Sequence, residues 1–363
     1  MIRQEKGSIT PNHFIFCVAC FILSSPLVQA FYISIIKQES WIAIIAGFLA
    51  FIPVLLLYFS LIKSFPQKNL IQINDLVFGK TGKAVSLLYI WFFLTIGSLN
   101  IRDAVSFVSI NILPETPPVV IGITFIAVCA WSARSGFETL VRHVMFFIFI
   151  SFLLIISSTL ISINNMNMEN LLPVFSQEFA EYARASHVVA AIPIGEIFIF
   201  LLFIPFVTGK HADIKKAYFF GALIGLAGIL IIFLRDILVL GDAITIAQYP
   251  SFETQRLIDV EEFFTRLEIF YALAIIIMLF YKTSVIIYAA SLGISQVFNL
   301  SGFKHITISI GAIALIYSFF VFETTAENLE WGVDTASIFS TLFQAVIPAI
   351  TIIVAKIIKR SGA

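Results

Sequence analysis

Long apolar stretches separated by short polar connections follow one another along almost the whole chain. A helix that crosses a bilayer needs about 20 consecutive, mainly apolar residues. The runs of that length are 12–36, 41–61, 84–110, 140–163, 187–208, 217–240, 264–292, 306–322 and 335–358. A further run, 118–131, is shorter and is counted as a span because the charge pattern requires it. The pattern predicts an all-α polytopic membrane protein with about ten transmembrane helices.

Basic side chains are distributed unevenly among the connections between these runs. With the N-terminus in the cytoplasm, fifteen Lys and Arg residues fall on the inner side and six on the outer side. The outer six are Lys37, Arg102, Arg184, Arg235, Arg256 and Arg266. Cytoplasmic loops of membrane proteins carry an excess of Lys and Arg. The asymmetry therefore predicts that both termini are cytoplasmic, and omitting the run 118–131 would destroy it.

Composition excludes several classes of protein. Of the 363 residues, 60% are hydrophobic and 12% are charged, whereas soluble domains are about 25% charged. The formal net charge is zero, so there is no basic surface for nucleic acid. Cys17, Cys20 and Cys129 lack the nearby ligands of a metal or redox site. Neither HExxH nor GxSxG occurs. We expect no enzyme, no metal and no cofactor, and the lipid bilayer is the partner that the composition requires.

Two predicted spans contain proline next to small or polar residues near their middle. The first carries Ser24-Ser25-Pro26 and the sixth carries Pro193-Ile194-Gly195-Glu196. The two sites occupy matching positions in two halves of the chain, 12–163 and 187–358. Interrupted helices at matching positions indicate a midplane binding site in an inverted-repeat transporter. Two unrelated kinks are the alternative. A break exposes helix ends whose dipoles favour charged ligand groups, which suits a small zwitterion.

Two ionisable side chains are placed near the bilayer centre. Glu196 lies at the second break, and Lys282 lies in the middle of the eighth span. Charge at this depth is costly, so such residues are usually paired or functional. Direct or water-mediated pairing of the two is the simplest interpretation. Alternatively, Lys282 replaces a sodium ion beside the broken first helix while Glu196 carries a proton. A purely structural pair is the third possibility.

Further polar residues accompany these candidates. Gly97 and Asn100 in the third span, and Tyr281 and Ser284 in the eighth, are candidate ligand-site residues. Their orientation is not predicted, because the eighth span is apolar on all sides. The neighbouring pairs Arg102-Asp103 and Arg235-Asp236 are expected to form vestibule or interhelix ion pairs rather than to bind the ligand. Gly221 and Gly225 form a small-xxx-small pair that predicts a helix-packing face.

With these residues identified, the chain resembles the B subunits of bacterial spore germinant receptors, the endospore germination permeases. The resemblance covers nearly the whole chain. The features that carry it are the Ser24-Ser25-Pro26 break, the segment 73–83 with its GKTGK ending, the Ile194-Gly195-Glu196-Ile197 core and the Phe280-Tyr281-Lys282 core. The segment 65–83 is also expected to contain a short interfacial helix that ends at the GKTGK string.

The resemblance implies the fold of the amino acid–polyamine–organocation transporters, with two inverted five-helix repeats and helices 1 and 6 unwound. Carried over, the unwound segments are 24–26 and 193–196. It also implies a small-molecule germinant as ligand, the spore inner membrane as location, and an A subunit and a lipoprotein C subunit as partners.

Two functions are compatible with this fold and these residues. The first is a germinant-binding receptor subunit that senses a small molecule, an amino acid by preference, at the midplane. The alternative is a proton-coupled amino acid transporter in which Glu196 takes up and releases the coupling proton. A scaffold without a ligand would leave Glu196 and Lys282 without a role.

Overall fold

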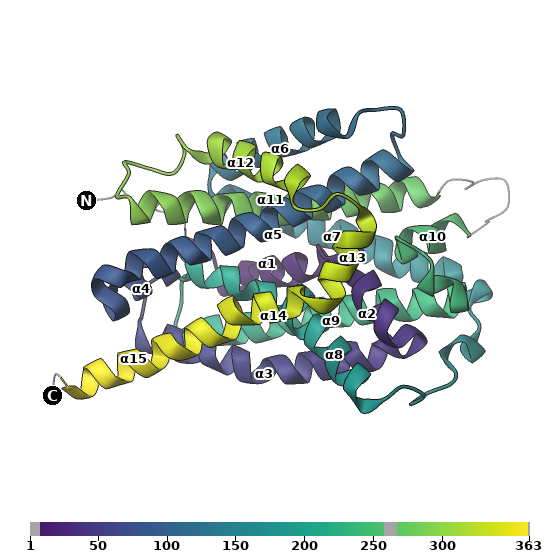
Figure 1. Ribbon diagram of the computed structural model, residues 1–363, viewed down its shortest axis with the longest axis horizontal. Helices are drawn as coiled ribbons and strands as arrows, with labels where there is room; N and C mark the ends of the chain where they lie inside the picture. Colours follow the sequence, from purple (N-terminus) through teal and green to yellow (C-terminus); the bar gives the residue numbers. More distant parts are fainter. Residues whose placement is uncertain (1–7, 258–266, 362–363) are drawn as a thin grey trace.

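The computed structural model describes residues 8–257 and 267–361, which fold into one helical bundle (Figure 1). Among these residues the only extended pairing is an isolated bridge between Ile9 and Val207. The main helices are α1 (Pro11–Leu23), α2 (Gln29–Ile36), α3 (Ser40–Ser64), α4 (Leu70–Phe78), α5 (Gly82–Asn111), α6 (Pro118–Ser135), α7 (Phe137–Ile161), α8 (Phe179–Val189), α9 (His211–Leu240), α10 (Pro250–Arg256), α11 (Leu267–Val297), α12 (Thr307–Phe320), α13 (Thr325–Asp334), α14 (Ala336–Thr341) and α15 (Ile347–Ser361).

The number of spans depends on how broken helices are counted. Eight stretches of described residues are long and apolar enough to cross a bilayer, and a ninth is added if α12 and α13, bent by 97°, are one span. That count joins α2 to α3 and leaves out α1, which has 13 residues. The predicted first span, 12–36, instead joins α1 to α2, which accounts for the predicted total of about ten. The all-helical membrane fold is confirmed.

The two ends of the bundle carry different short helices. In Figure 1, α4 and the end of α15 lie at one end of the bundle, α10 lies toward the other end, and α13 lies between the middle and that end. The helix α4 is the predicted interfacial segment, and it starts with a capping box between Asn69 and Gln72. It ends at Phe78, and the φ of +57° at the capping residue Gly79 suits glycine. Connections predicted to be inner and outer therefore lie at opposite ends.

Span 1 is broken where its sequence predicts. The helix α1 ends at Leu23, and a short 3-10 turn, η1 (Pro26–Val28), leads into α2. The Ser24 hydroxyl and the Ser24 N–H both donate to the carbonyl of Cys20, at 2.6 and 2.9 Å. Pro26 has no N–H to continue the α-helical pattern, and it disfavours helical backbone at Ser25. The break therefore follows directly from the residues 24–26.

Span 6 differs from the expected unwound segment. The helix α8 passes into a π-helical turn, η6 (Ala190–Ile194), and then into a 3-10 helix, η7 (Gly195–Leu202). The predicted break at 193–196 is thus a change of helical hydrogen bonding and not a gap. Pro193 removes one backbone donor from the middle of the π turn. A Cβ on Gly195 would lie 2.7 Å from the carbonyl oxygen of Ala190, so the backbone itself requires glycine here, and it would also displace the side-chain amide of Gln344.

The glycine pair of span 7 is a helix-packing face, as predicted. A Cβ on Gly221 would lie 2.7 Å from the carbonyl oxygen of Ile15, and one on Gly225 would lie 2.7 Å from Ile22. Both contacts are with α1. The two glycines therefore let α9 approach the first half of the broken span closely.

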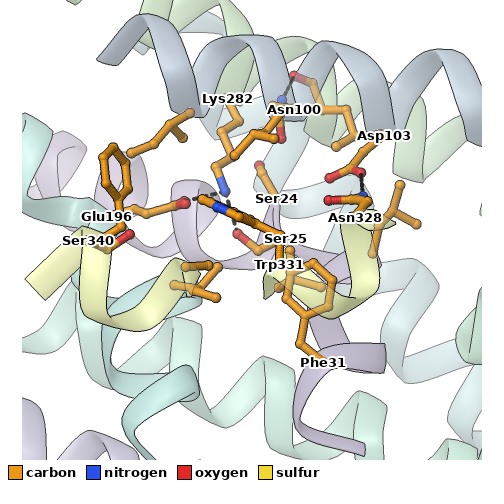
Figure 2. Close-up of a pocket in the computed structure, with 18 residues that line it drawn as sticks. Ser24, Ser25, Phe31, Asn100, Asp103, Glu196, Lys282, Asn328, Trp331 and Ser340 are labelled. Atoms are coloured by element: carbon orange, nitrogen blue, oxygen red, sulfur yellow. Dashed lines mark hydrogen bonds and ion pairs between the residues drawn. The ribbon is translucent and has the colours of Figure 1, made fainter. Parts of the chain in front are cut away.

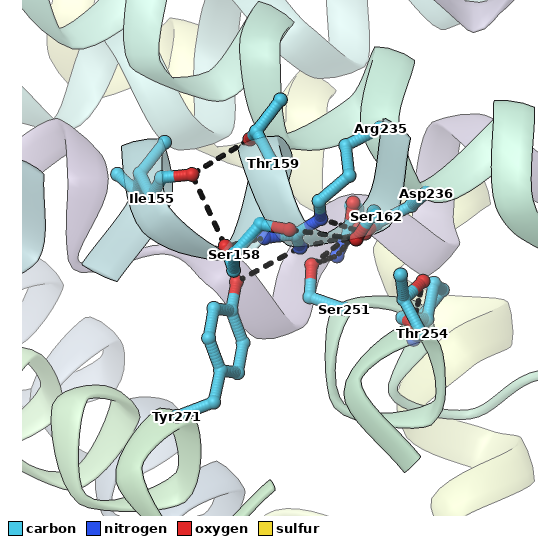
Figure 3. Close-up of polar contacts among 11 residues, drawn as sticks. Ile155, Ser158, Thr159, Ser162, Arg235, Asp236, Ser251, Thr254 and Tyr271 are labelled. Atoms are coloured by element: carbon cyan, nitrogen blue, oxygen red, sulfur yellow. Dashed lines mark hydrogen bonds and ion pairs between the residues drawn. The ribbon is translucent and has the colours of Figure 1, made fainter. Parts of the chain in front are cut away.

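A buried polar cluster joins α9 to neighbouring spans (Figure 3). The Arg235 guanidinium donates to Asp236 Oδ1 from Nε and Nη2, at 2.9 and 2.6 Å. Its Nη1 donates to the Ser158 hydroxyl on α7 at 2.7 Å, and Nη2 lies 3.3 Å from the Tyr271 hydroxyl on α11. Both side chains of the ion pair are fully buried. The predicted Arg235-Asp236 ion pair is confirmed.

The same cluster holds the second half of the broken span. Ser251 of α10 donates to Asp236 Oδ2, and Gln29 of α2 donates to the Ser251 hydroxyl at 2.6 Å. All three side chains are buried. The first turn of α2 is therefore tied to α9 and α10 through side chains that lipid and water do not reach.

Candidate functional site

A small cavity lies beside the break of span 1 (Figure 2). Its volume is about 40 Å³. The lining comes from the two halves of span 1 and from α5, η6, η7, α11, α13 and α14. The lining residues are Ser24, Ser25, Leu27, Val28, Phe31, Ile96, Leu99, Asn100, Asp103, Ile192, Glu196, Leu279, Lys282, Asn328, Trp331, Ala336, Phe339 and Ser340. Both predicted breaks thus contribute to one site.

Lys282 of α11 joins the two breaks. Its Nζ lies 2.5 Å from Glu196 Oε2 and donates to the Ser25 hydroxyl at 2.6 Å. The same ammonium lies 5.4 Å from the centre of the Phe21 ring. The side chains of Lys282 and Glu196 are 3% and 8% exposed. The sequence interpretation left open whether these residues meet, and the structure shows that they form a buried ion pair.

The surroundings of Lys282 favour a positive charge. The ammonium lies at the C-terminal end of α1, where the helix dipole is negative. The Phe21 ring adds a cation–π contact. One ammonium thus contacts a residue of each break, as direct pairing of Lys282 with Glu196 requires. The alternative, in which Lys282 replaces a sodium ion while Glu196 carries a proton, stays a prediction.

The opposite end of the cavity holds a second carboxylate. Asp103 Oδ1 accepts from the Asn328 side-chain amide at 3.2 Å (Figure 2). The interpretation of Arg102-Asp103 as an ion pair outside the ligand site needs correction. Arg102 donates to the carbonyls of Ser318 and Glu323, at 3.4 and 3.3 Å, and Asp103 lines the cavity. On a long helix, adjacent residues point in directions about 100° apart, so they need not share a partner.

A wider pocket of about 290 Å³ lies next to this end. It is lined by residues of α2, α5 and α13 and by the connection after α9. The residues that line both spaces are Leu27, Phe31, Asp103 and Asn328. These four side chains lie between the small cavity and the wider pocket, which is on the side of the bundle toward α10.

The predicted site residues divide into two groups. Ser24, Ser25, Asn100, Glu196 and Lys282 line the cavity. Asn100 is held in place by its amide, which donates to the Thr283 hydroxyl at 2.6 Å and to the carbonyl of Leu279 at 3.2 Å. These five were recognisable as polar or breaking residues in apolar spans.

The other predicted residues lie outside the cavity. A Cβ on Gly97 would lie 3.0 Å from Ile286, so this glycine serves packing against α11. The Tyr281 hydroxyl donates to the carbonyl of Cys17 at 3.3 Å, and Ser284 is fully buried away from the cavity. Pro193, Ile194 and Gly195 contribute backbone to η6 and η7 rather than lining. Pro26 begins η1, and its side chain is outside the described structure.

Most of the apolar lining was not predicted. Leu27 and Phe31 are one helical turn apart directly after the break, so their spacing could have identified them. Trp331 and Asn328 belong to a helix beyond the predicted ninth span, and no local signal points that helix toward the site. Among residues 8–257 and 267–361, no cluster of three His, Cys, Asp or Glu side chains could hold a metal ion.

Two solved structures share the arrangement of helices over most of this chain. Mhp1, a nucleobase-cation-symport-1 family transporter in a closed conformation with bromovinylhydantoin bound, aligns with a TM-score of 0.65. It is 12% identical, and the alignment covers 97% of this chain and 79% of Mhp1. MhsT in complex with L-phenylalanine aligns with a TM-score of 0.64 at 14% identity, covering 91% and 86%. The fold thus defines the class of polytopic α-helical membrane proteins, with the helical arrangement of these solved structures, as the sequence predicted.

Sequence comparison narrows this class to a family. The family model described as spore germination protein, a spore permease family, matches residues 8–327. Spore germination protein KB of Bacillus subtilis (strain 168) is 27% identical over 358 residues, covering 97% of this chain and 95% of that protein. The chain therefore belongs to the spore germination protein family, and the resemblance stated from its motifs is confirmed.

Proposed function

We propose that this protein is the membrane-embedded subunit of a spore germination receptor that binds the nutrient germinant. The observation that carries the proposal is the small cavity in which Lys282 contacts a residue from each break. A ligand that disturbs this contact alters how the two breaks are held together. Because ligands shift conformations through differential affinity, this is a direct route from binding to a signal.

The charges of the cavity indicate a small amino acid. The carboxylate of an amino acid would interact with the Lys282 ammonium and the Ser25 hydroxyl, and the α-ammonium would interact with Asp103. The side chain would contact Phe31 and Trp331. A cavity of about 40 Å³ holds about three water molecules, at about 10–15 Å³ each. Ligands larger than the smallest amino acids would require α13 to move outward.

The cellular setting belongs to the same proposal. The protein resides in the spore inner membrane with both termini in the cytoplasm and works with an A subunit and a lipoprotein C subunit. Family membership supports the location and the partners. The excess of basic residues in connections at the end of the bundle that carries α4 supports the orientation.

Purified protein in liposomes provides the direct test. We would measure binding and uptake of labelled amino acids, sugars and nucleosides, with and without an imposed pH gradient. Saturable binding of an amino acid without accumulation is the expected result. Uptake that follows the gradient would instead make the protein a proton-coupled amino acid transporter. Absence of binding by every amino acid would contradict the proposed ligand class.

Asp103→Asn is expected to reduce amino acid affinity about tenfold to a hundredfold. Loss of a charged hydrogen bond costs about 1.5–3 kcal/mol, and every 1.4 kcal/mol is about tenfold in affinity. Asparagine keeps an oxygen that can accept from Asn328, so the fold is retained. The measurement compares an amino acid with its analogue lacking the amino group. Only the amino acid should lose affinity, because the analogue makes no contact with Asp103.

Asp242→Asn is the matched control, because Asp242 is exposed in the outer connection and lines neither space. An equal loss of amino acid affinity in Asp103→Asn and Asp242→Asn would show that Asp103 does not contact the ligand. So would an equal loss of affinity for the amino acid and for its analogue in Asp103→Asn.

A further inference from the structure

A second, larger crevice lies on the side of the bundle, between α3, α8 and the π-helical turn η10 (Leu342–Val346) that follows α14. Its volume is about 810 Å³, within the range of about 300–1,000 Å³ that small-molecule sites occupy. The space exists because six lining residues are alanines: Ala46, Ala50, Ala183, Ala190, Ala191 and Ala345. None of its lining residues is Asp, Glu, Lys or Arg. The crevice is therefore unsuited to a charged nutrient.

The crevice is continuous with surface that faces the hydrocarbon of the membrane. Large apolar side chains on the same helices flank it, and Leu49, Leu342 and Val346 are 59%, 46% and 43% exposed. Lipid covers such residues in a membrane protein. Water is a poor occupant of this space, because it requires free polar partners and most of the exposed wall is apolar. Leaving it empty would forfeit the dispersion contacts of every wall.

Polar side chains line the wall of the crevice that α8 forms, beginning just before the first residue of that helix. Gln177 and Tyr182 line the crevice near the beginning of α8, and His187 Nε2 lies 2.7 Å from the Thr341 hydroxyl deeper inside. The other polar side chains inside the crevice also hydrogen-bond within the protein: Ser186 donates to the Tyr182 carbonyl at 2.6 Å, and Gln344 donates to the Ala191 carbonyl at 2.9 Å. The deeper walls therefore offer an occupant mainly apolar contacts. An acyl chain suits such walls, because it makes only apolar contacts and needs no hydrogen-bond partner.

We propose that this crevice binds one acyl chain of a membrane phospholipid. The site is separate from the cavity at Lys282 and does not depend on which germinant that cavity binds. It borders both π-helical turns, η6 and η10, which are joined by the Gln344 amide donating to the carbonyl of Ala191 at 2.9 Å. Short π-helical turns occur frequently at functional sites. The bound chain therefore contacts the turn that leads into Gly195 and Glu196.

Photolabelling tests the proposal on the full-length protein in bilayers. The probe is phosphatidylcholine with a diazirine near the end of one acyl chain, and the readout is mass spectrometry of labelled peptides. We expect labelling of the peptides that contain Ala50 and Ala183 to exceed labelling of lipid-facing peptides of α6. Excess unlabelled phospholipid should lower the labelling of these peptides more than that of α6.

Variants that fill the crevice with a larger side chain distinguish a specific lipid site from general contact with lipid. Ala50→Phe and Ala183→Phe each place a ring in the crevice from an exposed position, so at least one variant is expected to fold. Either should reduce labelling of the opposite wall at least threefold. Ala127→Phe adds the same ring to an exposed position of α6 outside the crevice and should leave the labelling unchanged.

Two results would overturn the proposal. One is labelling of the crevice no higher than that of α6 and insensitive to Ala50→Phe and Ala183→Phe. The other is loss of labelling when the receptor partner subunits are present, which would make a partner helix the occupant.

Discussion

Lys282→Met is expected to destabilise the protein by about 3–5 kcal/mol, because it leaves the Glu196 carboxylate buried without its partner. Adding Glu196→Gln should restore part of that loss, since the remaining side chain is neutral. Thermal melting of the purified single and double variants in one detergent measures the coupling between the two residues. Lys216→Met, at an exposed position near the start of α9, is the control and should melt like the parent.

Glu196→Gln alone should affect the response to ligand more than the fold. The amide can still accept a hydrogen bond from Lys282, whereas the charge that holds the two breaks together is lost. Ligand-induced change in protease sensitivity of the purified protein is the readout. If the losses of stability in the double variant are strictly additive, Glu196 and Lys282 are not energetically coupled. An unchanged ligand response in the Glu196→Gln variant would show that the ion pair has no role in signalling.

Arg235→Met is expected to cost a similar amount, about 3–5 kcal/mol, because Asp236 then stays buried as an unpaired charge. The effect should also be local. Asp236 holds Ser251, which in turn holds Gln29, so amide hydrogen exchange in α2 should accelerate more than in α5. Thermal melting and hydrogen exchange by mass spectrometry measure the two effects.

Arg142→Met provides the comparison for this variant. Arg142 pairs with Glu138 at 2.6 Å, but both side chains are largely exposed. Exposed ion pairs contribute about 0–1 kcal/mol. Burial therefore predicts a large difference in stability between Arg235→Met and Arg142→Met, although each variant removes one arginine from an ion pair. Equal melting of Arg235→Met and Arg142→Met would show that the cluster does not anchor α2.

Hydropathy was enough to predict the class of fold, because a bilayer demands about 20 apolar residues for every crossing helix. The break at Ser24 to Pro26 was equally predictable, because proline removes a backbone donor whatever surrounds it. Pro193 shows the limit of that argument. Its helix continues as π and 3-10 turns, because neighbouring groups compensate a missing donor in ways that the local sequence does not contain.

Site residues were predictable where they carried charge. Glu196 and Lys282 stood out because charge in hydrocarbon needs a partner, and the partner proved to be the other residue. Asp103 was misinterpreted because it lies beside an arginine in the sequence. Its true neighbour, Asn328, comes from a helix 225 positions later.

The sequence by itself determined the membrane fold, the position of the first break and the two ionisable residues, Glu196 and Lys282, that stand out in apolar spans. Only the tertiary structure decided which faces of the spans line the cavity, that α13 brings Asn328 and Trp331 to it, and where alanines open a crevice toward lipid. The reason is physical. In a membrane, both the lipid side and the protein side of a helix are apolar, so hydrophobic periodicity does not report orientation. Packing against distant helices sets it instead.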